Sequence, residues 1–387
     1  MLASAAHAAL VLLLLASLAY SGVALVAAGR FLSRRRRPSA ASQPPASILV
    51  PLCGADPWTE EICRCFCRQD YPAYQVIFGV HRADDPAVPI VHAVLAAHPG
   101  RDLELVVAGD AVAPNPKVDS LRRMLTHARH ELVVMVDGDV QVTPDFLARV
   151  LPPLADERVG LVTCLYRAGQ AASLLDRLEA VGIAAEFAPG VLVAWLTEGM
   201  SFALGAVMAT RQSVLRAVGG LEALAPYLAD DYQLGNLVRR AGHEVYLSPH
   251  VVETFMASSG LGAMLRHQLR WSRATRVSRP RGHLGLFVTH GTTLALLALL
   301  LDHASPASLL LPALAILAIL AQGLVAWVVG VRVLGDGILR RGLWLLPLRD
   351  LLGFAIWCAS LLGREVEWRG ARYTVTRDGR LAPARSR

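Results

Sequence analysis

The sequence contains little cysteine, and this shortage excludes one class of protein. Six cysteines, unevenly placed in a chain of 387 residues, do not form the disulfide framework of a small secreted protein. Three of them, Cys63, Cys65 and Cys67, occupy every second position, a spacing that lacks the C-x₂₋₄-C pairs of a zinc site. A reduced, cytosolic environment therefore fits the cysteines better.

Aromatic residues are also scarce, at 6% of the chain, and the arginines lie beside apolar runs instead of among aromatic side chains. The formal charge of +7 therefore does not indicate a nucleic-acid-binding surface, and we predict no nucleic-acid partner. Basic residues beside apolar runs are typical of membrane proteins, in which they gather on the cytosolic side. With 54% hydrophobic residues and a mean hydropathy of +0.43, part of the chain is expected to lie in a lipid bilayer.

The two ends of the chain carry the long apolar runs. Residues 8–28 are almost entirely Ala, Leu and Val, and the positive charges all follow this run, which predicts a signal-anchor with its N-terminus outside. Residues 284–301 and 307–331 are also long enough to span a bilayer. The protein is therefore predicted to be a multi-pass membrane protein whose remaining part faces the cytosol.

The last apolar stretch, residues 343–362, is interrupted by Pro347, Arg349 and Asp350. A single crossing there would place an arginine-rich tail outside, against the positive-inside tendency. We therefore predict a re-entrant or interfacial hairpin in which Arg349 and Asp350 pair with each other, and a cytosolic tail that begins with a short β-ribbon.

The middle of the chain alternates between strand and helix patterns. Apolar runs of strand type occupy residues 46–52, 74–80, 103–109, 132–136 and 158–166, with helical patterns between most of them. This alternation predicts an α/β domain with a mostly parallel, doubly wound sheet. The predicted organisation is a transmembrane anchor (1–30), a basic linker rich in Pro and Ser (31–45), the α/β domain (46–256), a basic interfacial helix (257–282), a transmembrane region (283–363) and a basic tail (364–387).

Candidate functional residues follow the predicted strands. Asp137 and Asp139 come directly after the run 132–136, and Asp84 and Asp85 follow the run 74–80. In parallel α/β sheets the ligands collect beyond the carboxyl ends of the strands, and carboxylates there suit Mg²⁺ or Mn²⁺ together with a diphosphate. An Asp-Gly-Asp sequence is also common in surface turns, so the metal site depends on the surrounding residues.

Two later segments carry further charged candidates. Asp230 and Asp231 precede a helical pattern, and we assign Asp230 to capping that helix, which leaves Asp231 available for chemistry. Arginines recur every three or four residues between Met264 and Arg281, with Trp271 among them. This face could bind anionic lipid headgroups, and one or two of its arginines could instead grip a pyrophosphate.

Seven short motifs occur in an order and spacing that resemble family 2/21 type membrane glycosyltransferases, and most resemble the ceramide glucosyltransferase-like branch with its bacterial, hopanoid-associated members. The motifs are Pro51-Leu52, Asp84-Asp85-Pro86-Ala87, Asn115-Pro116-Lys117, Asp137-Gly138-Asp139, Gly199-Met200-Ser201, Asp230-Asp231-Tyr232 and Arg270-Trp271. The resemblance covers residues 46–281, and it extends to the apolar ends in their layout. Each motif is short, but seven in order are specific.

The resemblance implies a GT-A type, Rossmann-like fold and an inverting transfer of glucose or N-acetylglucosamine from a UDP-sugar to a lipid hydroxyl of a ceramide or a hopanoid polyol. It implies that Asp231 is the general base and that Asp137 and Asp139 hold Mg²⁺ or Mn²⁺. The implied nucleotide-sugar contacts are Asp84, Asp85, Lys117, Asp137, Arg270 and Trp271. The high Ala, Arg and Leu content further suggests a bacterial inner membrane.

Two features of the sequence distinguish the alternatives. His267 occupies the position before Arg270-Trp271 at which the family usually has Gln or Arg. The apolar segments near the C-terminus are too few to enclose a polymer channel. Both features argue against the interpretation of the protein as a processive polysaccharide synthase. Retention through a covalent intermediate would need a second carboxylate, for which Glu198 is the candidate. A membrane-anchored scaffold with a degenerate site is the non-enzyme alternative, although every expected carboxylate is present.

Overall fold

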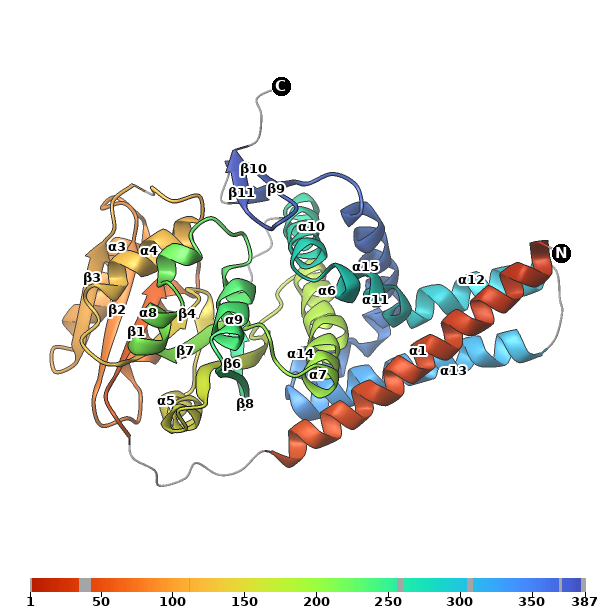
Figure 1. Ribbon diagram of the computed structural model, residues 1–387, viewed down its shortest axis with the longest axis horizontal. Coiled ribbons are helices and arrows are strands. Elements are labelled where there is room, and N and C mark those ends of the chain that lie inside the picture. Colours follow the sequence, from red (N-terminus) through yellow and green to blue (C-terminus); the bar gives the residue numbers. More distant parts are fainter. Residues whose placement is uncertain are drawn as a thin grey trace.

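The computed structural model describes residues 2–34, 43–110, 112–255, 260–304, 309–368 and 371–383. It consists of an α/β part and a group of long helices that extends away from it, and a small β-ribbon lies next to α10 (Figure 1). The central part of the predicted linker, the arginines at 35–37 and Arg369, Arg385 and Arg387 lie outside the described residues.

The first half of the main sheet is parallel, as predicted. Its strands run in the order β3-β2-β1-β4. They are β1 Ala46–Pro51, β2 Tyr74–Val80, β3 Asp102–Val107 and β4 Leu132–Val136, connected by the helices α2 Thr59–Cys67, α3 Ala87–Ala97 and α4 Pro116–Leu125. Every residue of β1, β2 and β4 is buried, as expected for strands covered on both faces.

The second half of the sheet contains an antiparallel strand. Its strands are β5 Val140–Gln141, β6 Val159–Ala168, β7 Val207–Arg211 and β8 Glu244–Thr254, and its short helices are α5 Phe146–Val150, α8 Gln212–Ala217 and α9 Asp230–Arg240, with 3₁₀ turns at Pro152–Ala155 and Leu221–Ala223. Strand β7 lies antiparallel between β4 and β6, and Val207 is paired with Val136. The loop before β7 therefore lies beside the end of β4.

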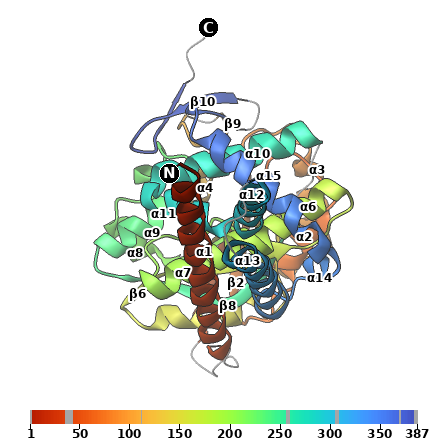
Figure 2. The same cartoon turned by 90° about the vertical axis from the view of Figure 1, so that its right-hand side faces the viewer.

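The helical part contains α1 Leu2–Ser33, α6 Leu174–Gly182, α7 Ala188–Thr197, α10 Leu261–Ser278, α11 Pro280–Gly285, α12 Gly291–Ala304, α13 Leu310–Ala326, α14 Gly337–Gly342 and α15 Leu346–Ser360. Single turns of π-helix follow α6 (Ile183–Phe187) and α13 (Trp327–Val333), and 3₁₀ turns occur at Leu286–Thr289 and Leu343–Leu345. Helices α1, α12 and α13 pack side by side and project from the rest of the molecule (Figures 1 and 2).

Four helical segments of the described chain are long and apolar enough to cross a membrane: Ala5–Ser33, Leu174–Thr197, Leu310–Val333 and Gly337–Ser360. A fifth candidate is a bent pair, Pro280–Thr289 with Gly291–His303, whose halves meet at 56°. The span expected at 284–301 thus contains a bend, and Leu174–Thr197 was not among the predicted membrane segments. That segment packs against α1, α14 and α15 and is largely buried, so its apolar residues serve the protein interior as well.

The prediction for residues 343–362 was wrong in two respects. The segment does not fold back as a hairpin, because residues 346–360 form the single helix α15. Arg349 and Asp350 do not pair with each other, because adjacent residues on a helix project about 100° apart. Arg349 instead pairs with Glu186, and Asp350 binds side chains of α12 and α13.

The predicted β-ribbon near the C-terminus is confirmed, with strands β9 Glu365–Trp368, β10 Ala371–Val375 and β11 Leu381–Pro383 in antiparallel order. Val366, Val375 and Leu381 of the ribbon bury Leu228, a residue of the loop that precedes α9. The ribbon therefore packs against the loop that leads to Asp230 and Asp231.

Candidate active site

The turn after β4 presents Asp137 and Asp139 at the carboxyl end of the sheet. Gly138 lies between them, and a Cβ atom at this position would lie 2.6 Å from the carbonyl oxygen of Pro51. Only glycine therefore allows the turn to pass so close to the end of β1. The backbone N–H of Asp137 donates to the carbonyl oxygen of Ala206, 3.3 Å away, which ties the turn to the loop before β7.

Lys117 reaches this turn from the start of α4. The side chain of Asn115 caps the helix by accepting a hydrogen bond from Val118 N, while its amide donates to the carbonyl oxygen of Tyr227. Lys117 Nζ lies 2.6 Å from Asp137 Oδ1 and 3.6 Å from Asp230 Oδ2. Burial opposes the charge of this lysine, but the two carboxylates outweigh that effect and raise its pKa.

Asp230 and Asp231 begin α9, and the predicted capping role of Asp230 is wrong. Ala229 occupies the N-cap position without a side-chain hydrogen bond, and Asp230 is a buried residue of the first turn. Its Oδ1 accepts a hydrogen bond of 3.4 Å from Asn115, whereas no described residue forms a hydrogen bond with its Oδ2. A contact of tertiary structure therefore decides the orientation of Asp230, instead of the local preference of a helix end.

Gly205 marks the place where the charged groups converge. A Cβ atom at this position would lie 3.3 Å from Asp231 Oδ2, 3.4 Å from Asp137 Oδ2 and 3.4 Å from Lys117 Nζ. The side chains of β4, α4 and α9 therefore border one small space that the absence of a side chain at position 205 keeps open. We call Lys117, Asp137, Asp139, Asp230 and Asp231 the sheet-edge cluster.

The electrostatics of the sheet-edge cluster favour a bound cation. Burial, and next the carboxylate of Asp137, raise the pKa of Asp139 to about 7. Burial, and next the carboxylate of Asp230, raise the pKa of Asp231 to about 6. Four carboxylates share one ammonium group here, so their mutual repulsion is only partly compensated. A divalent cation would relieve it.

The residues present fit Mg²⁺ or Mn²⁺ with a diphosphate. Such ions are held in many enzymes by one or two carboxylates, with waters and substrate phosphates completing the shell. Asp137 and Asp139 supply this number, with oxygen donors of the kind these ions prefer. Within the described chain no group of three or more His, Cys, Asp or Glu side chains has the geometry of a complete protein-made metal site. Waters and substrate phosphates would supply the remaining ligands.

Asp84 and Asp85 lie in the loop after β2, and the structure gives them different contacts. Asp84 is exposed and forms an ion pair with Arg82, with 2.6 Å between Nη2 and Oδ2. Asp85 accepts hydrogen bonds from the backbone N–H groups of Gly54, at 3.0 Å, and Ala87. Asp85 thus holds the loop that follows β1, and neither carboxylate bonds to the sheet-edge cluster in the described part of the chain.

Arg270 and Trp271 lie on α10, where both side chains contact aromatic rings. The guanidinium of Arg270 lies 5.7 Å from the ring centroid of Trp368 in the ribbon. The Trp271 ring packs against Phe187 of the π-turn and lies 4.5 Å from the ring of His267. Glu198, the candidate for a covalent mechanism, pairs with Arg279 at 2.6 Å.

His267 and Gln268 connect α10 to α6 and α15, a role that sequence reasoning missed. His267 Nδ1 and Gln268 Nε2 each lie 3.2 Å from the same oxygen of Glu179. Gln268 Oε1 accepts a hydrogen bond from Arg349. The sequence offered one signal, because a glutamine and a histidine beside an Arg-Trp pair suggest polar contacts, but their partner lies 88 residues earlier in the chain.

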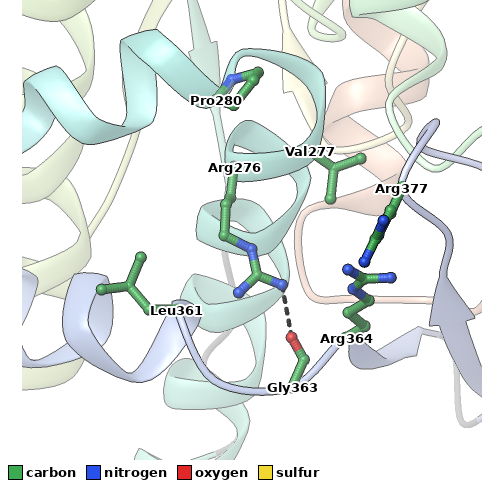
Figure 3. Close-up of a pocket in the computed structure, with 7 residues that line it drawn as sticks. All are labelled: Arg276, Val277, Pro280, Leu361, Gly363, Arg364 and Arg377. Carbon is green, nitrogen blue, oxygen red and sulfur yellow. Dashed lines mark hydrogen bonds between the residues drawn. The ribbon is translucent and has the colours of Figure 1, made fainter.

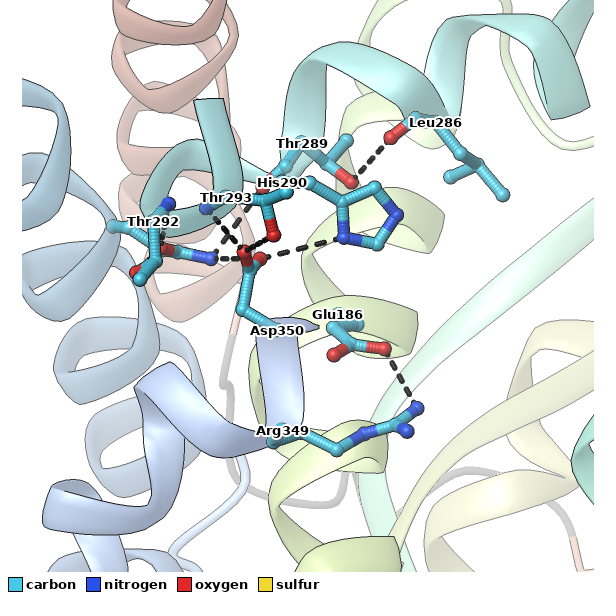
Figure 4. A network of polar contacts seen from close by, with 9 residues as sticks. Glu186, Leu286, Thr289, His290, Thr292, Thr293, Arg349 and Asp350 are labelled. Atoms are coloured by element: carbon cyan, nitrogen blue, oxygen red, sulfur yellow. Dashed lines mark hydrogen bonds and ion pairs between the residues drawn. The ribbon is translucent and has the colours of Figure 1, made fainter. Parts of the chain in front are cut away.

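A second buried polar group, which we call the helix cluster, comprises Glu186, His290, Thr292, Thr293, Gln322, Arg349 and Asp350 (Figure 4). Asp350 accepts hydrogen bonds of 2.8 and 2.7 Å from the backbone N–H and hydroxyl of Thr293, and one of 2.7 Å from Gln322. The Nδ1 atom of His290 lies 3.4 Å from Asp350 Oδ1. Arg349 donates to Glu186 at 2.7 Å. The cluster thus joins α12, α13 and α15 to the π-turn after α6.

Comparison with known proteins agrees with this geometry. The sequence model of glycosyl transferase family 21 matches residues 9–381. Ceramide glucosyltransferase 1 of Caenorhabditis elegans is 24% identical over 233 residues, which is 59% of this chain and 49% of that protein. Ceramide glucosyltransferase 3 of the same organism is 25% identical over 236 residues, 59% of this chain and 50% of that protein. The chain thus spans about half the length of these curated relatives.

Among solved structures, the mannosyltransferase PcManGT from Pyrobaculum calidifontis, in complex with GDP-Man and Mn²⁺, has a similar fold. It superimposes with a TM-score of 0.59 at 19% identity, over 91% of this chain and 99% of that chain. The likeness confirms the predicted α/β fold of GT-A type with apolar helices at both ends of the chain.

Proposed function

Since the chain belongs to glycosyl transferase family 21 and resembles ceramide glucosyltransferases, we propose that it transfers glucose or N-acetylglucosamine, with inversion, from a UDP-sugar to a hydroxyl of a membrane lipid, either a ceramide or a hopanoid polyol. The observation that carries this proposal is the convergence of Lys117, Asp137 and Asp231 on the space beside Gly205. One carboxylate and one cation-binding edge in the same small space are what an inverting transfer requires.

Asp231 is the proposed general base. Its pKa of about 6 means that the carboxylate is ionised at pH 7. This pKa is also close enough to the operating pH for the carboxylate to accept the proton of the acceptor hydroxyl. Its Oδ1 accepts a hydrogen bond of 2.7 Å from Tyr232 N, which leaves Oδ2 directed toward the space beside Gly205. The backbone contact therefore orients the carboxylate and keeps one oxygen available.

The donor diphosphate is proposed to lie between the sheet-edge cluster and α10. Asp137 and Asp139 would hold Mg²⁺ or Mn²⁺, an ion that neutralises charge developing on the departing diphosphate. Lys117 orients Asp137 through their ion pair, and its positive charge lies beside the same space. Asp84, Asp85, Arg270 and Trp271 are proposed to contact the nucleotide-sugar or acceptor, and the Mn²⁺ complex of the archaeal mannosyltransferase supports the choice of metal.

The membrane helices are proposed to bring the acceptor to this site from the bilayer. We propose that the chain lies in a bacterial inner membrane with the α/β domain (46–256) on the cytosolic face, anchored by residues 1–30 and 283–363. Residues 31–45, 257–282 and 364–387 would form the linker, the interfacial helix and the tail. The candidate spans and the basic residues that follow them support this arrangement.

A mass-spectrometric assay of the purified protein tests the proposal. The protein in detergent is incubated with UDP-glucose or UDP-N-acetylglucosamine and with ceramide or bacteriohopanetetrol, in the presence of Mg²⁺ or EDTA. A mass increase of one hexose or one N-acetylhexosamine on a single lipid, lost with EDTA, is expected. A growing polymer without a lipid product would instead identify a processive synthase, and no product with any pair would refute the proposed substrates.

A further inference from the structure

Three arginines line a cavity between α10, the end of α15 and the ribbon (Figure 3). The cavity has a volume of about 330 Å³, and its lining residues are Arg276, Val277, Pro280, Leu361, Gly363, Arg364 and Arg377. None of the residues of the sheet-edge cluster contributes to it. It is therefore separate from the proposed donor site.

The positive charges of this cavity have no carboxylate counterpart in the described chain. Arg276 Nη2 donates to the carbonyl oxygen of Gly363 at 2.6 Å, and no ion pair involves Arg276, Arg364 or Arg377 within the described ranges. Burial and the charge of Arg364 lower the pKa of Arg276. The guanidinium groups of Arg276 and Arg364 therefore repel each other, Arg377 lines the same cavity, and an anion between these arginines would reduce the repulsion.

Other arginines of the same elements do have carboxylate partners. Arg266 of α10 lies 3.7 Å from Glu367 of the ribbon, and Arg380 lies 2.9 Å from Asp378. Glu367 and Asp378 are thus close to the cavity residues in sequence, but each pairs with an arginine that does not line the cavity. The lack of an acidic residue at this cavity is a local property and not a general shortage of acids.

The cavity lies where apolar helices end. Pro280 begins the bent candidate span, and Leu361 directly follows the candidate span Gly337–Ser360. Leu284 and Leu362, next to these ends, are 61% and 72% exposed. If these helices cross a bilayer, exposed leucines at their ends would contact acyl chains, and the arginines would then lie at the level of the lipid headgroups.

We propose that this cavity binds the phosphate group of an anionic phospholipid. The planar forks of Arg276, Arg364 and Arg377 provide paired N–H donors suited to phosphate oxygens. Pro280 and Leu361 provide the apolar side of the cavity toward the acyl chains. A lipid phosphate is favoured over a free anion because the site combines both kinds of surface.

Binding there would also stabilise the loop that leads to Asp231. The ribbon that carries Arg377 donates from Leu381 N to the carbonyl oxygen of Pro226 at 2.7 Å and accepts from Leu228 N at Gly379 O, 3.2 Å away. A lipid that holds the ribbon against α10 would therefore reduce motion of the loop before α9. This consequence for activity rests on the proposed function, whereas the binding itself does not.

The test is native mass spectrometry of the full-length protein titrated with phosphatidylglycerol or phosphatidylcholine. The single variant Arg364→Ala is expected to weaken phosphatidylglycerol binding roughly 5-fold. The double variant Arg364→Ala/Arg377→Ala is expected to weaken it roughly 30-fold. Arg372→Ala is the matched control, because Arg372 is an exposed arginine of the same ribbon that does not line the cavity. It should change binding less than about 2-fold.

Each further arm gives a decisive result. Arg364→Lys keeps the charge and should retain more binding than Arg364→Ala, which separates loss of charge from misfolding. Equal phosphatidylglycerol occupancy in the double variant and the unaltered protein would overturn the proposal. Displacement of the lipid by millimolar inorganic phosphate would show a free-anion site, and displacement by UDP would assign the cavity to the donor; either result refutes a lipid site. If the unaltered protein bound phosphatidylglycerol but transferred no sugar to any lipid, only the proposed function would be contradicted.

Discussion

The sheet-edge cluster and the helix cluster both bury charged side chains, but they satisfy them differently. In the helix cluster, Asp350 is fully buried and receives three hydrogen bonds from Thr293 and Gln322. In the sheet-edge cluster, Asp230 Oδ2 lies 3.6 Å from Lys117 Nζ and has no hydrogen-bond partner among the described residues, and the pKa values of Asp139 and Asp231 are raised. A carboxylate held by donors stabilises a helix packing, whereas one left short of donors is available to a ligand.

The largest expected effect comes from Asp231→Asn. The amide has the shape of the carboxylate but cannot accept the proton, so the rate of transfer should fall by about 10³-fold, within the range for general bases. Binding of UDP, measured by isothermal titration calorimetry, should stay within about 3-fold, since the metal ligands are intact. Asp156→Asn, at an exposed aspartate paired with Arg158, is the matched control. Loss of UDP binding in Asp231→Asn would instead make Asp231 a nucleotide-binding or structural residue.

Asp350→Ala should reverse the pattern, with a loss of stability and little direct effect on chemistry. The substitution leaves the donors of Thr293 and Gln322 without their acceptor, which we expect to cost about 1–3 kcal/mol of unfolding free energy. Thermal unfolding in detergent measures this loss. The transfer rate per folded molecule should stay within about 3-fold. A protein of unchanged melting temperature with lost activity would contradict the structural role of the helix cluster.

The pH dependence of transfer should report Asp231. The base acts in its ionised form, and its raised pKa of about 6 means that activity is present above this pH and is lost as the pH falls through it. Below pH 6 the value of kcat/KM should decline about tenfold per pH unit. The profile is measured at saturating Mg²⁺, so that protonation of Asp139 does not limit metal binding. A flat profile down to pH 5 together with retained transfer in Asp231→Asn would exclude Asp231 as the base.

The smallest expected effect is that of Gly205→Ala. The added methyl group would lie 3.3–3.4 Å from Asp231, Asp137 and Lys117, so it would crowd the proposed reaction space without removing a functional group. We expect the KM for the UDP-sugar to rise about 3- to 10-fold, roughly 1 kcal/mol, with the fold unchanged. Gly100→Ala is the control, because a Cβ atom there meets nothing within 4 Å. Equal effects of the two substitutions would show that the space beside Gly205 is not used.

Much of the α/β domain could be predicted from sequence because its signals are local. Apolar runs at 46–52, 74–80 and 132–136 predicted strands that the structure confirms almost to the residue. The closely spaced aspartates after Val136, together with the motifs around them, indicated a candidate metal site at the sheet edge. The fold and the family followed from the order of such short motifs, which needs no knowledge of distant contacts.

The roles of single charged residues could not be predicted in the same way. The capping role assigned to Asp230 was wrong because Asn115 and Lys117, more than a hundred positions earlier, draw its carboxylate into the sheet-edge cluster. The pairing of Arg349 with Asp350 was wrong because Glu186, 163 residues away, receives the guanidinium. In both cases a neighbour in sequence was chosen where a neighbour in space decides.

The sequence by itself determined most strands of the sheet, the apolar character of the chain ends, the family and the set of carboxylates, because these depend on periodicity and on motifs a few residues long. The tertiary structure alone decided which carboxylates meet Lys117, which ones the candidate membrane helices satisfy, and which arginines beside Pro280 and Leu361 have no carboxylate partner among the described residues. The physical reason is that burial and electrostatic interaction depend on distance in space, and chain topology brings together residues that no local pattern relates.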